Sequence, residues 1–286
     1  MFVSVIIPNL NAPTIDQTLL AIERQTYSDY EVLVVGMDIW GLVRANDKVR
    51  FIFSETPLPP ARARNWGAKE ARGDILVFTD ADCIPRPDWL ETFVKCFNHP
   101  EVAVVGGGVD ISSSGNYWIL ADNLSMFYEY LAIHPAGQRR QLPSLNLAIR
   151  REIFEAIGGF DERYPKPSGE DADLTIRLHK CGYHLYFEPR AIVVHRPPRD
   201  TLFDLFWHGY YQGMYSTKVD KRYASEEGLP AILRERWVLR CFAPVISIGA
   251  IARMFITYPN LWVYWYTLPA IFLAKVAWCW GASSHP

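Results

Sequence analysis

The run Gly73-Asp74-Ile75-Leu76-Val77-Phe78-Thr79-Asp80-Ala81-Asp82 is the stretch of this 286-residue chain that decides its fold. A short apolar, β-branched segment follows Gly73 and ends in two carboxylates one residue apart. Its length and composition predict a buried strand rather than a helix. Acids at the carboxyl end of such a strand point into the crevice where open α/β sheets bind ligands. Asp80 and Asp82 are therefore candidates to hold a divalent metal that carries a diphosphate. The alternative is that both acids only begin a loop that turns toward Pro85.

Similar short apolar runs precede this stretch, at Phe2–Ile7, Glu31–Val35 and Val49–Phe53. A helical pattern with Ile15, Leu19, Leu20 and Ile22 follows the first run, and a second covers Ala61–Ala71 after the third run and ends before Gly73. Strands that alternate with helices at this spacing predict an α/β fold with a doubly wound, mostly parallel sheet.

The overall composition excludes some classes of function. A formal net charge of -2 and a pI near 6.4 give no reason to expect a nucleic-acid partner. The sequence has no P-loop of the form G-x-x-x-x-G-K-[ST], and Gly106-Gly107-Gly108 lacks the strand-then-helix context of a dinucleotide fingerprint. ATP hydrolysis and NAD chemistry are therefore disfavoured.

Two arginines, Arg62 and Arg64, lie on the predicted helix just before the acidic strand. The planar guanidinium stays charged and makes two hydrogen bonds at once, which suits phosphate. The alternative is a solvated helix face, because most surface charges have no specific partner.

A second acidic group occurs in Ser168-Gly169-Glu170-Asp171, at the start of a predicted short helix that stops near Gly182. A structural explanation is available, since Ser168 as N-cap with Asp171 three residues later resembles a capping box. Asp173 and Arg177 are also spaced to form an i,i+4 ion pair. A catalytic role for Glu170 and Asp171 is the alternative.

Three of these segments together resemble the successive signatures of family 2 glycosyltransferases, which are inverting enzymes of the GT-A fold that use nucleotide-diphosphate sugars and a divalent metal. They are Val3-Ser4-Val5-Ile6-Ile7-Pro8-Asn9-Leu10-Asn11, Ala63-Arg64-Asn65-Trp66-Gly67, and the opening run from Gly73 to Asp82. The Ile157-Gly158-Gly159-Phe160-Asp161-Glu162 turn resembles the acceptor side of the family, so the resemblance extends from about Val3 to His195.

The resemblance implies a role for each matching residue. Asp82 would coordinate Mg²⁺ or Mn²⁺, and Asp80 would bind the ribose or assist the metal. Tyr183–Phe187 and Ala191–Val194 predict two closing strands, and His195 ends the second. Relatives place a metal-ligating or diphosphate-contacting histidine at this point, although such a histidine is usually structural. The nucleotide-sugar would contact a further set of residues: Pro8, Asn9, Asp38, Arg64 and Asn65.

The acidic pair downstream would then carry the chemistry. An acceptor hydroxyl must lose its proton as it attacks the anomeric carbon, so a carboxylate must lie within hydrogen-bond reach. By the resemblance Asp171 is this base and Glu170 orients donor or acceptor. One departure concerns the base-contacting acids after the second strand, because Gly36-Met37 stands there and Asp38 follows.

The composition changes after Pro198. Thr201–Tyr215 predicts an aromatic helix of the kind that lies at a membrane surface, and Glu226–Arg240 is charged. Trp237–Tyr258 and Leu261–Gly281 are apolar enough to predict a membrane hairpin turned at Pro259-Asn260. Arginines before it favour a membrane-associated protein whose catalytic domain faces the cytoplasm. Two core helices, or an interfacial hairpin, are the alternatives.

These observations predict three regions: a catalytic domain over 1–198, interfacial linker helices over 199–236, and a membrane hairpin over 237–286. The predicted function is metal-dependent, inverting transfer of a sugar from a nucleotide-diphosphate donor to a hydroxyl of a lipid-linked or envelope-polysaccharide acceptor. One alternative is a polyprenyl-phosphate glycosyltransferase. The other is a non-catalytic membrane protein that binds nucleotide-sugar or glycan.

Overall fold

The computed structural model describes residues 1–111, 115–223, 232 and 235–284 of the chain. These residues form two compact units. The first comprises Met1–Asp110 and Glu129–Arg196, and the second comprises Ile111–Tyr128 and Pro197–Pro286. The second unit therefore includes a segment, residues 111–128, that interrupts the first unit in sequence.

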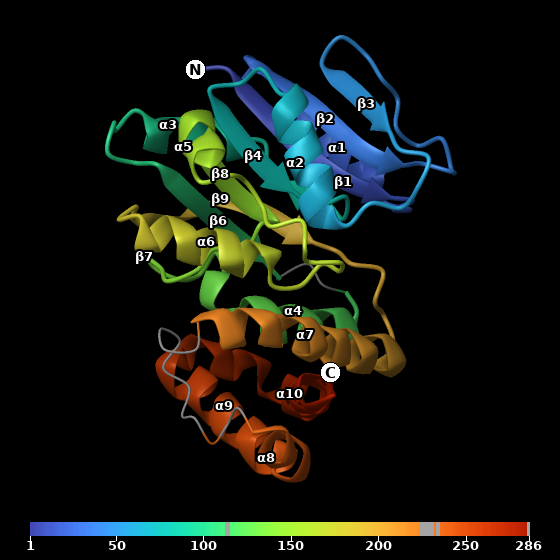
Figure 1. Cartoon of the computed structure of the whole chain (residues 1–286), viewed down its shortest axis with the longest axis vertical. Coiled ribbons are helices and arrows are strands. Elements are labelled where there is room, and N and C mark those ends of the chain that lie inside the picture. The colour runs from blue at the N-terminus through green and yellow to red at the C-terminus, as the bar shows by residue number, and fades with distance from the viewer. Residues whose placement is uncertain (112–114, 224–231, 233–234, 285–286) are drawn as a thin grey trace. The chain divides into compact units, whose positions relative to one another are not determined.

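A nine-stranded sheet forms the centre of the first unit, with the strand order β3-β2-β1-β4-β8-β6-β9-β5 and β7 paired to β9 (Figure 1). The strands are β1 (Val3–Leu10), β2 (Tyr30–Met37), β3 (Val49–Phe53), β4 (Ile75–Thr79), β5 (Cys83–Pro85), β6 (Val104–Asp110), β7 (Gly137–Gln138), β8 (Asn146–Arg150) and β9 (Leu185–His195). Its helices are α1 (Ile15–Glu23), α2 (Pro60–Glu70), α3 (Trp89–Phe97), α5 (Arg151–Ala156) and α6 (Glu170–Lys180), and the 3-10 turn η1 (Tyr128–Tyr130) lies at the boundary.

The prediction of an α/β fold is confirmed, but the sheet is mixed rather than mostly parallel. The pairs β1–β2, β1–β4, β2–β3 and β6–β9 are parallel. The pairs β4–β8, β6–β8, β5–β9 and β7–β9 are antiparallel. A long connection, and not a single crossover helix packed on the sheet, joins β6 to β8. Strand β8 can therefore run antiparallel to its two neighbours, β4 and β6.

The core explains why the opening stretch is central. All five residues of β4 are buried, as expected for a strand covered on both faces. On one face, α2 packs over β1 and β2 (Figure 1), and Phe78 meets the rings of Phe154 and Phe160 at centroid distances of 5.2 Å. Each such buried aromatic ring contributes roughly 2–3 kcal/mol of apolar stabilisation, so the end of β4 is held firmly.

Two strand boundaries differ from the predicted ones. Pairing of β1 with β4 ends at Ile6 with Phe78, but β1 continues along β2 as far as Leu10 because only one neighbour is needed to extend it. The two predicted closing strands after Tyr183 form one strand, β9, whose register against β6 shifts between Gly107 and Gly108. A Cβ on Gly107 would lie 2.2 Å from the carbonyl oxygen of Ala191, so the glycine run accommodates this bulge.

The second unit is helical, with α4 (Tyr117–Phe127), α7 (Leu202–Tyr223), α8 (Arg236–Cys241), α9 (Ala243–Thr257), the 3-10 segment η3 (Pro259–Thr267) and α10 (Leu268–Ser283). Helix α10 is its centre and contacts α4, α7, α8 and α9. Glycines bring α7 and α10 close together, because a Cβ on Gly213 would overlap the carbonyl of Trp278 and one on Gly281 would overlap that of Tyr210. Most of the charged segment predicted at Glu226–Arg240 lies outside the described residues.

The predicted membrane-spanning hairpin is wrong for the part of the chain that the structure describes, because no helix there has the length and apolarity needed to cross a bilayer. Prolines lie inside both predicted spans. Pro244 is in the first turn of α9, within Trp237–Tyr258, and Pro269 is in the first turn of α10, within Leu261–Gly281. Between the two spans, Pro259 begins a 3-10 segment with a kink at Tyr264. The prediction that the catalytic domain faces the cytoplasm was based on those spans, and it stays a prediction.

Candidate active site

The loop Asp80-Ala81-Asp82 lies between β4 and the short strand β5, and α1 holds it in place. The hydroxyls of Thr14 and Thr18 both donate to the carbonyl oxygen of Ala81, at 3.1 and 3.0 Å. Thr14 is the N-cap residue of α1, but its side chain makes no cap bond and donates to this loop instead. The backbone between the two carboxylates is thus fixed while both side chains keep some exposure, 32% for Asp80 and 19% for Asp82.

Arg64 lies buried under this loop and bridges the two acidic motifs. Its Nη2 donates to Asp80 Oδ1 at 2.7 Å and its Nη1 donates to Glu170 Oε1 at 2.9 Å. Burial alone would lower the pKa of this guanidinium, but the charges of Asp80 and Glu170 outweigh burial and raise it. The solvated-face alternative is therefore wrong for Arg64, whereas Arg62 is exposed, 3.9 Å from Glu162.

Glu170 and Asp171 begin α6, and the burial of both raises their pKa values. For Glu170 the cause is burial first and the adjacent Asp171 second, and together they raise its pKa to about 7. For Asp171 burial again raises the pKa, although its oxygens accept from the backbone N–H groups of Ser144 at 3.2 Å and Ala172 at 2.8 Å. This region therefore binds a proton more readily than free carboxyls do.

The structural account of these acids is correct only in part. The N-cap of α6 is Gly169 in the left-handed conformation, with φ 88°, and not Ser168. The predicted pair of Asp173 and Arg177 is present at 2.8 Å. Arg177 also donates to the carbonyls of Ile157 and Gly159, so it ties α6 to the glycine turn. Asp171 makes no ion pair of this structural kind among the described residues.

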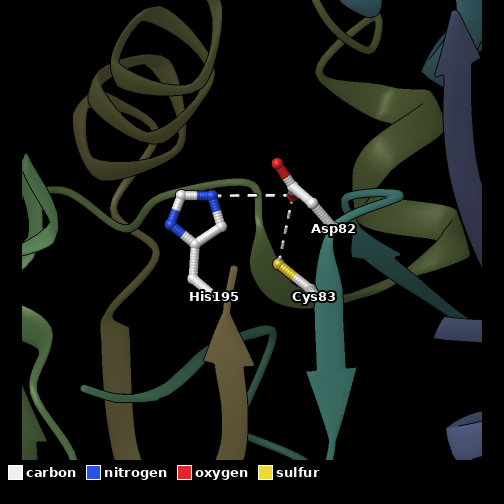
Figure 2. Close-up of side chains that lie close together, drawn as sticks. All are labelled: Asp82, Cys83 and His195. Carbon is white, nitrogen blue, oxygen red and sulfur yellow. Dashed lines mark hydrogen bonds and ion pairs between the residues drawn. The ribbon is translucent and has the colours of Figure 1, made fainter. Parts of the chain in front are cut away.

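A possible metal site lies at the other end of the loop. Asp82, Cys83 and His195 each offer one ligand atom, and these atoms all lie within 4.8 Å of one another (Figure 2). His195 Nε2 is 3.5 Å from Asp82 Oδ1, because His195 and Cys83 face each other in the antiparallel β5–β9 pair. The predicted ligands Asp82 and His195 are thus brought together, while Asp80 is not one of the three.

Two of the three donor side chains, Asp82 and His195, suit Mn²⁺ or Mg²⁺. A carboxylate oxygen suits both ions, and an imidazole nitrogen is accepted by Mn²⁺ more readily than by Mg²⁺. Burial raises the pKa of the Cys83 thiol well above its usual value, and its soft sulfur is a poor ligand for a hard cation. Cys83 was not predicted, since only the cross-strand register shows its position.

The residues predicted to bind the nucleotide fall into two groups. Asn9 and Asn65 use their side chains on the protein itself: Asn9 donates to the Met37 carbonyl at 2.8 Å, and Asn65 both donates to and accepts from the backbone of Phe160. Pro8 remains partly exposed next to Asn9 in β1. The side-chain amides of these two asparagines therefore hold the backbone around the site in place, and their hydrogen bonds are made to the protein itself.

Asp38 differs, because it keeps an unused acceptor. Its Oδ2 accepts from the backbone N–H of Val43 at 2.6 Å, while its Oδ1 is buried and has no hydrogen bond among the residues the structure describes. Gly36 stands where the family has an acid because φ is +132° there and a Cβ would lie 2.1 Å from the carbonyl oxygen of Asn9. The first acid after this strand is therefore Asp38, two residues beyond Gly36.

Comparison with known proteins identifies this arrangement. The model of the family described as glycosyl transferase family 2 matches residues 4–158, more than half of the chain. The chain belongs to this family. Among its relatives, glycosyltransferase AglE of Haloferax volcanii is 32% identical over 205 residues, which cover 68% of this chain and 66% of AglE. Glucosyl-dolichyl phosphate glucuronosyltransferase of the same organism is 25% identical over 231 residues, covering 68% and 70%.

The fold agrees with the family. The mannosyltransferase PcManGT from Pyrobaculum calidifontis, solved in complex with GDP-Man and Mn²⁺, superposes with a TM-score of 0.55 at 20% identity, over 96% of this chain and 85% of that one. A fold of the GT-A type is therefore confirmed. The chain spans about two thirds or less of the length of the first curated relatives it matches.

Proposed function

We propose that this family 2 chain is an inverting, metal-dependent glycosyltransferase that moves a sugar from a nucleotide-diphosphate donor to a hydroxyl of a glycan acceptor. One observation carries the proposal: buried Arg64 joins the acid at the end of β4, Asp80, to the acid pair that begins α6. The donor side and the acceptor side of the reaction are thereby held in one rigid assembly, as positioning of two reactants requires.

On the donor side, Asp82 and His195 are the residues that would hold the cation, with Asp80 close by in sequence and oriented by Arg64. A bound divalent metal would neutralise the departing diphosphate. The unused Oδ1 of Asp38 would accept a hydrogen bond from the base or ribose, since a buried oxygen without a partner costs about 1–3 kcal/mol until one is supplied.

On the acceptor side, Asp171 takes the proton of the attacking hydroxyl. The hydroxyl oxygen bonds to the anomeric carbon while the bond from that carbon to the diphosphate oxygen breaks, so the configuration inverts. Burial raises the pKa of Asp171, which makes it a stronger base than a free aspartate. Glu170, with a pKa raised to about 7, holds a proton for part of the time and so limits repulsion beside the base.

The decisive experiment combines donor binding with turnover. We expect nucleotide diphosphates to bind the whole chain more tightly with Mn²⁺ than without it, and Asp82→Ala to remove that difference. A screen of nucleotide sugars for hydrolysis by the purified protein identifies the donor. Binding that ignores both the metal and the substitution would refute the metal-diphosphate site; metal-linked binding with no transfer would favour the non-catalytic alternative.

Asp171→Asn distinguishes the two enzymatic alternatives. A hydroxyl acceptor needs a base, and its loss lowers turnover by roughly 10²–10⁴-fold. A polyprenyl-phosphate acceptor is already ionised, so full turnover by Asp171→Asn would support that alternative and overturn the assignment of Asp171. Donor binding should not change in either case, which separates a catalytic defect from misfolding.

We also propose a lipid-linked acceptor and association with a lipid surface. The name of the glucosyl-dolichyl phosphate relative supports the first. Support for the second comes from apolar side chains left exposed on α9 and η3: Val245, Ile248, Ile256, Trp262, Val263 and Trp265. Tryptophan is favoured at membrane interfaces. Flotation with lipid vesicles tests this. We expect the unaltered protein to float with the vesicles and the double variant Ile248→Ser/Ile256→Ser to stay in the unbound fraction. If the unaltered protein also stayed in the unbound fraction, association with a lipid surface would be refuted.

A further inference from the structure

A pocket of about 420 Å³ opens on the second unit, entirely within that unit, and nothing in the proposed function uses it. It is lined by Arg199, Phe203, Asp204, Trp207, His208 and Tyr211. Its volume lies within the range of small-molecule sites, about 300–1,000 Å³. The pocket therefore has the size of a ligand site, and its lining decides what kind of ligand fits.

Two parallel stripes of α7 form the floor of the pocket. Phe203, Trp207 and Tyr211 follow one another at i, i+4 and i+8, with the ring of Trp207 5.9 Å from Phe203 and 5.7 Å from Tyr211. Asp204 and His208 form a second, polar stripe beside it. The rings are exposed by 69%, 36% and 49% in chain order, which is unusual for large aromatic residues.

The aromatic stripe is held rigidly away from the rest of the unit. Gly209 and Gly213 lie two positions after Trp207 and Tyr211, about 200° around the helix. These glycines face α10 at distances that leave no room for a Cβ. The opposite face of α7 therefore presents its rings outward on a fixed backbone, which lowers the entropic cost of binding a ligand there.

Arg199 supplies fixed hydrogen-bond donors at the edge of the pocket. Its Nε donates to Asp122 Oδ2 at 3.0 Å, and Asp122 is buried, so the guanidinium plane is held in one orientation. Among the residues that the structure describes, the two Nη groups of Arg199 make no hydrogen bond. These two groups carry four of the five N–H donors of the guanidinium, so a ligand oxygen can accept from them.

Asp204 supplies an acceptor on the other side. Its Oδ2 accepts from the hydroxyl and backbone N–H of Thr201, which is the ordinary capping arrangement at the start of α7. No hydrogen bond to Oδ1 occurs within the described part of the chain. Donor, acceptor and aromatic floor together match a sugar ring, whose hydroxyls both accept and donate and whose C–H face packs on an aromatic ring.

Charge excludes the main alternative ligand. Arg199 is balanced by Asp122, and Asp204 adds a second negative charge, so the group reaches neutrality only when His208 is protonated. A phosphate or diphosphate would find no excess positive charge here, unlike in a phosphate site built from several cations. An uncharged saccharide has no such requirement.

We propose that this pocket binds a neutral pyranose ring of a glycan, with Trp207 and Tyr211 below the ring and Arg199 and Asp204 at its hydroxyls. The choice of a glycan rests on the proposed function, since an enzyme that transfers sugars to a glycan meets such rings. The site itself depends only on the second unit.

The test uses the whole chain and the methyl glycosides of glucose, galactose, mannose and N-acetylglucosamine as probes, followed by saturation-transfer NMR. We expect at least one glycoside to bind saturably, and Trp207→Leu to weaken it roughly tenfold or more, the equivalent of losing one stacked ring. Asp204→Asn, which retains a capping oxygen, should weaken it as well. Trp237→Leu removes an even more exposed tryptophan, 59% against 36% for Trp207, that lies outside the pocket, and it should change nothing.

Three results would overturn the proposal. They are absence of saturable binding by every glycoside, equal binding by Trp207→Leu and the unaltered protein, and preferential binding of inorganic pyrophosphate that Arg199→Gln abolishes. A loss of vesicle flotation in Trp207→Leu with unchanged glycoside binding would instead identify the stripe as a membrane surface. Mn²⁺-dependent binding of nucleotide diphosphates, measured in the same variants, reports separately on the proposed function.

Discussion

In the sheet-containing unit one buried guanidinium, Arg64, lies between two carboxylates, whereas in the helical unit one buried carboxylate, Asp122, lies between a guanidinium and an imidazole. We call these the Arg64 cluster (Arg64, Asp80, Glu170) and the Asp122 cluster (Asp122, Arg199, His208). Each cluster places three ionisable groups within hydrogen-bond distance. The central group is a cation between two acids in the Arg64 cluster and an anion between two basic groups in the Asp122 cluster.

The difference decides which carboxyl can exchange protons. In the Arg64 cluster one cation faces two carboxylates. Burial of Glu170, together with the charge of the adjacent Asp171, raises the pKa of Glu170 to about 7. In the Asp122 cluster burial alone would raise the pKa of Asp122, but His208 and Arg199 outweigh it and lower the pKa to about 2. An excess of acids thus creates a proton-binding site, while an excess of bases locks a carboxylate in its charged form.

The largest expected effect is on stability when the central residue of each cluster is removed. Arg64→Met leaves the buried Glu170 and the partly exposed Asp80 without their cation and should cost about 3–5 kcal/mol of unfolding free energy. Asp122→Asn keeps a hydrogen-bonding oxygen, and the two bases left beside it are partly exposed, so its cost should be about 1–3 kcal/mol. Urea denaturation at neutral pH measures both.

The matched control for this comparison is Arg62→Met, on the same helix turn but exposed, which should cost less than about 1 kcal/mol. If Arg64→Met were as mild as this control, the Arg64 cluster would not be a buried ion network.

The second expected effect is an opposite dependence of the two clusters on pH. The pKa of Glu170 is raised from 4.5 to about 7, so the folded chain holds a proton that the unfolded chain releases. Its contribution is complete below pH 4.5 and is lost as the pH rises through 7, on the order of 1–3 kcal/mol. The pKa of Asp122 is lowered from 3.8, so its contribution is present above pH 3.8 and is lost as the pH falls toward 2.

Thermal unfolding between pH 2.5 and 8 resolves these slopes, in roughly the ranges given by the two titrations. Glu170→Gln should flatten the decline toward neutral pH and leave the acid limb unchanged, and Asp122→Asn should do the reverse. A single substitution that altered both limbs equally would contradict the independence of the two clusters.

The smallest expected effect concerns the shape of the cation. Arg199→Lys keeps the charge near Asp122 but loses the planar fork, and because the Arg199 side chain is 26% exposed, water replaces the lost bonds. We expect a cost of about 0.5–1 kcal/mol. Arg64→Lys should cost more, since one ammonium cannot bridge Asp80 and Glu170 at once. Equal costs would mean that bridging geometry is unimportant.

Sequence patterns predict the parts of this chain that depend on local order. The strand Val49–Phe53 is found as predicted, and the family motifs place Asp82 and His195 in one cluster although 113 residues separate them. Patterns fail where partners decide the outcome. β1 runs past Ile7 because β2 supports it, and Cys83 joins the cluster through its register with His195.

The C-terminal third shows the other cause of failure. Apolar content predicts burial in a core or a membrane equally well, and prolines stand at the start of three helical segments here, at Pro244, Pro259 and Pro269. The Asp122 cluster was also missed, because it joins residue 122 to residues 199 and 208. Neither composition nor periodicity indicates a pairing across that separation.

The interruption of the first unit by residues 111–128 restricts how this polypeptide can be divided. The chain leaves the sheet after β6, contributes α4 to the helical unit, and returns before β7, so three chain crossings connect the units at 110/111, 128/129 and 196/197. A single cut after Arg196 would strand α4 without α7 and α10, exposing Leu120, Asp122 and Leu124. A single break in the chain therefore cannot separate the two units with both intact, and truncation variants must keep residues 111–128 together with the segment that begins at Pro197.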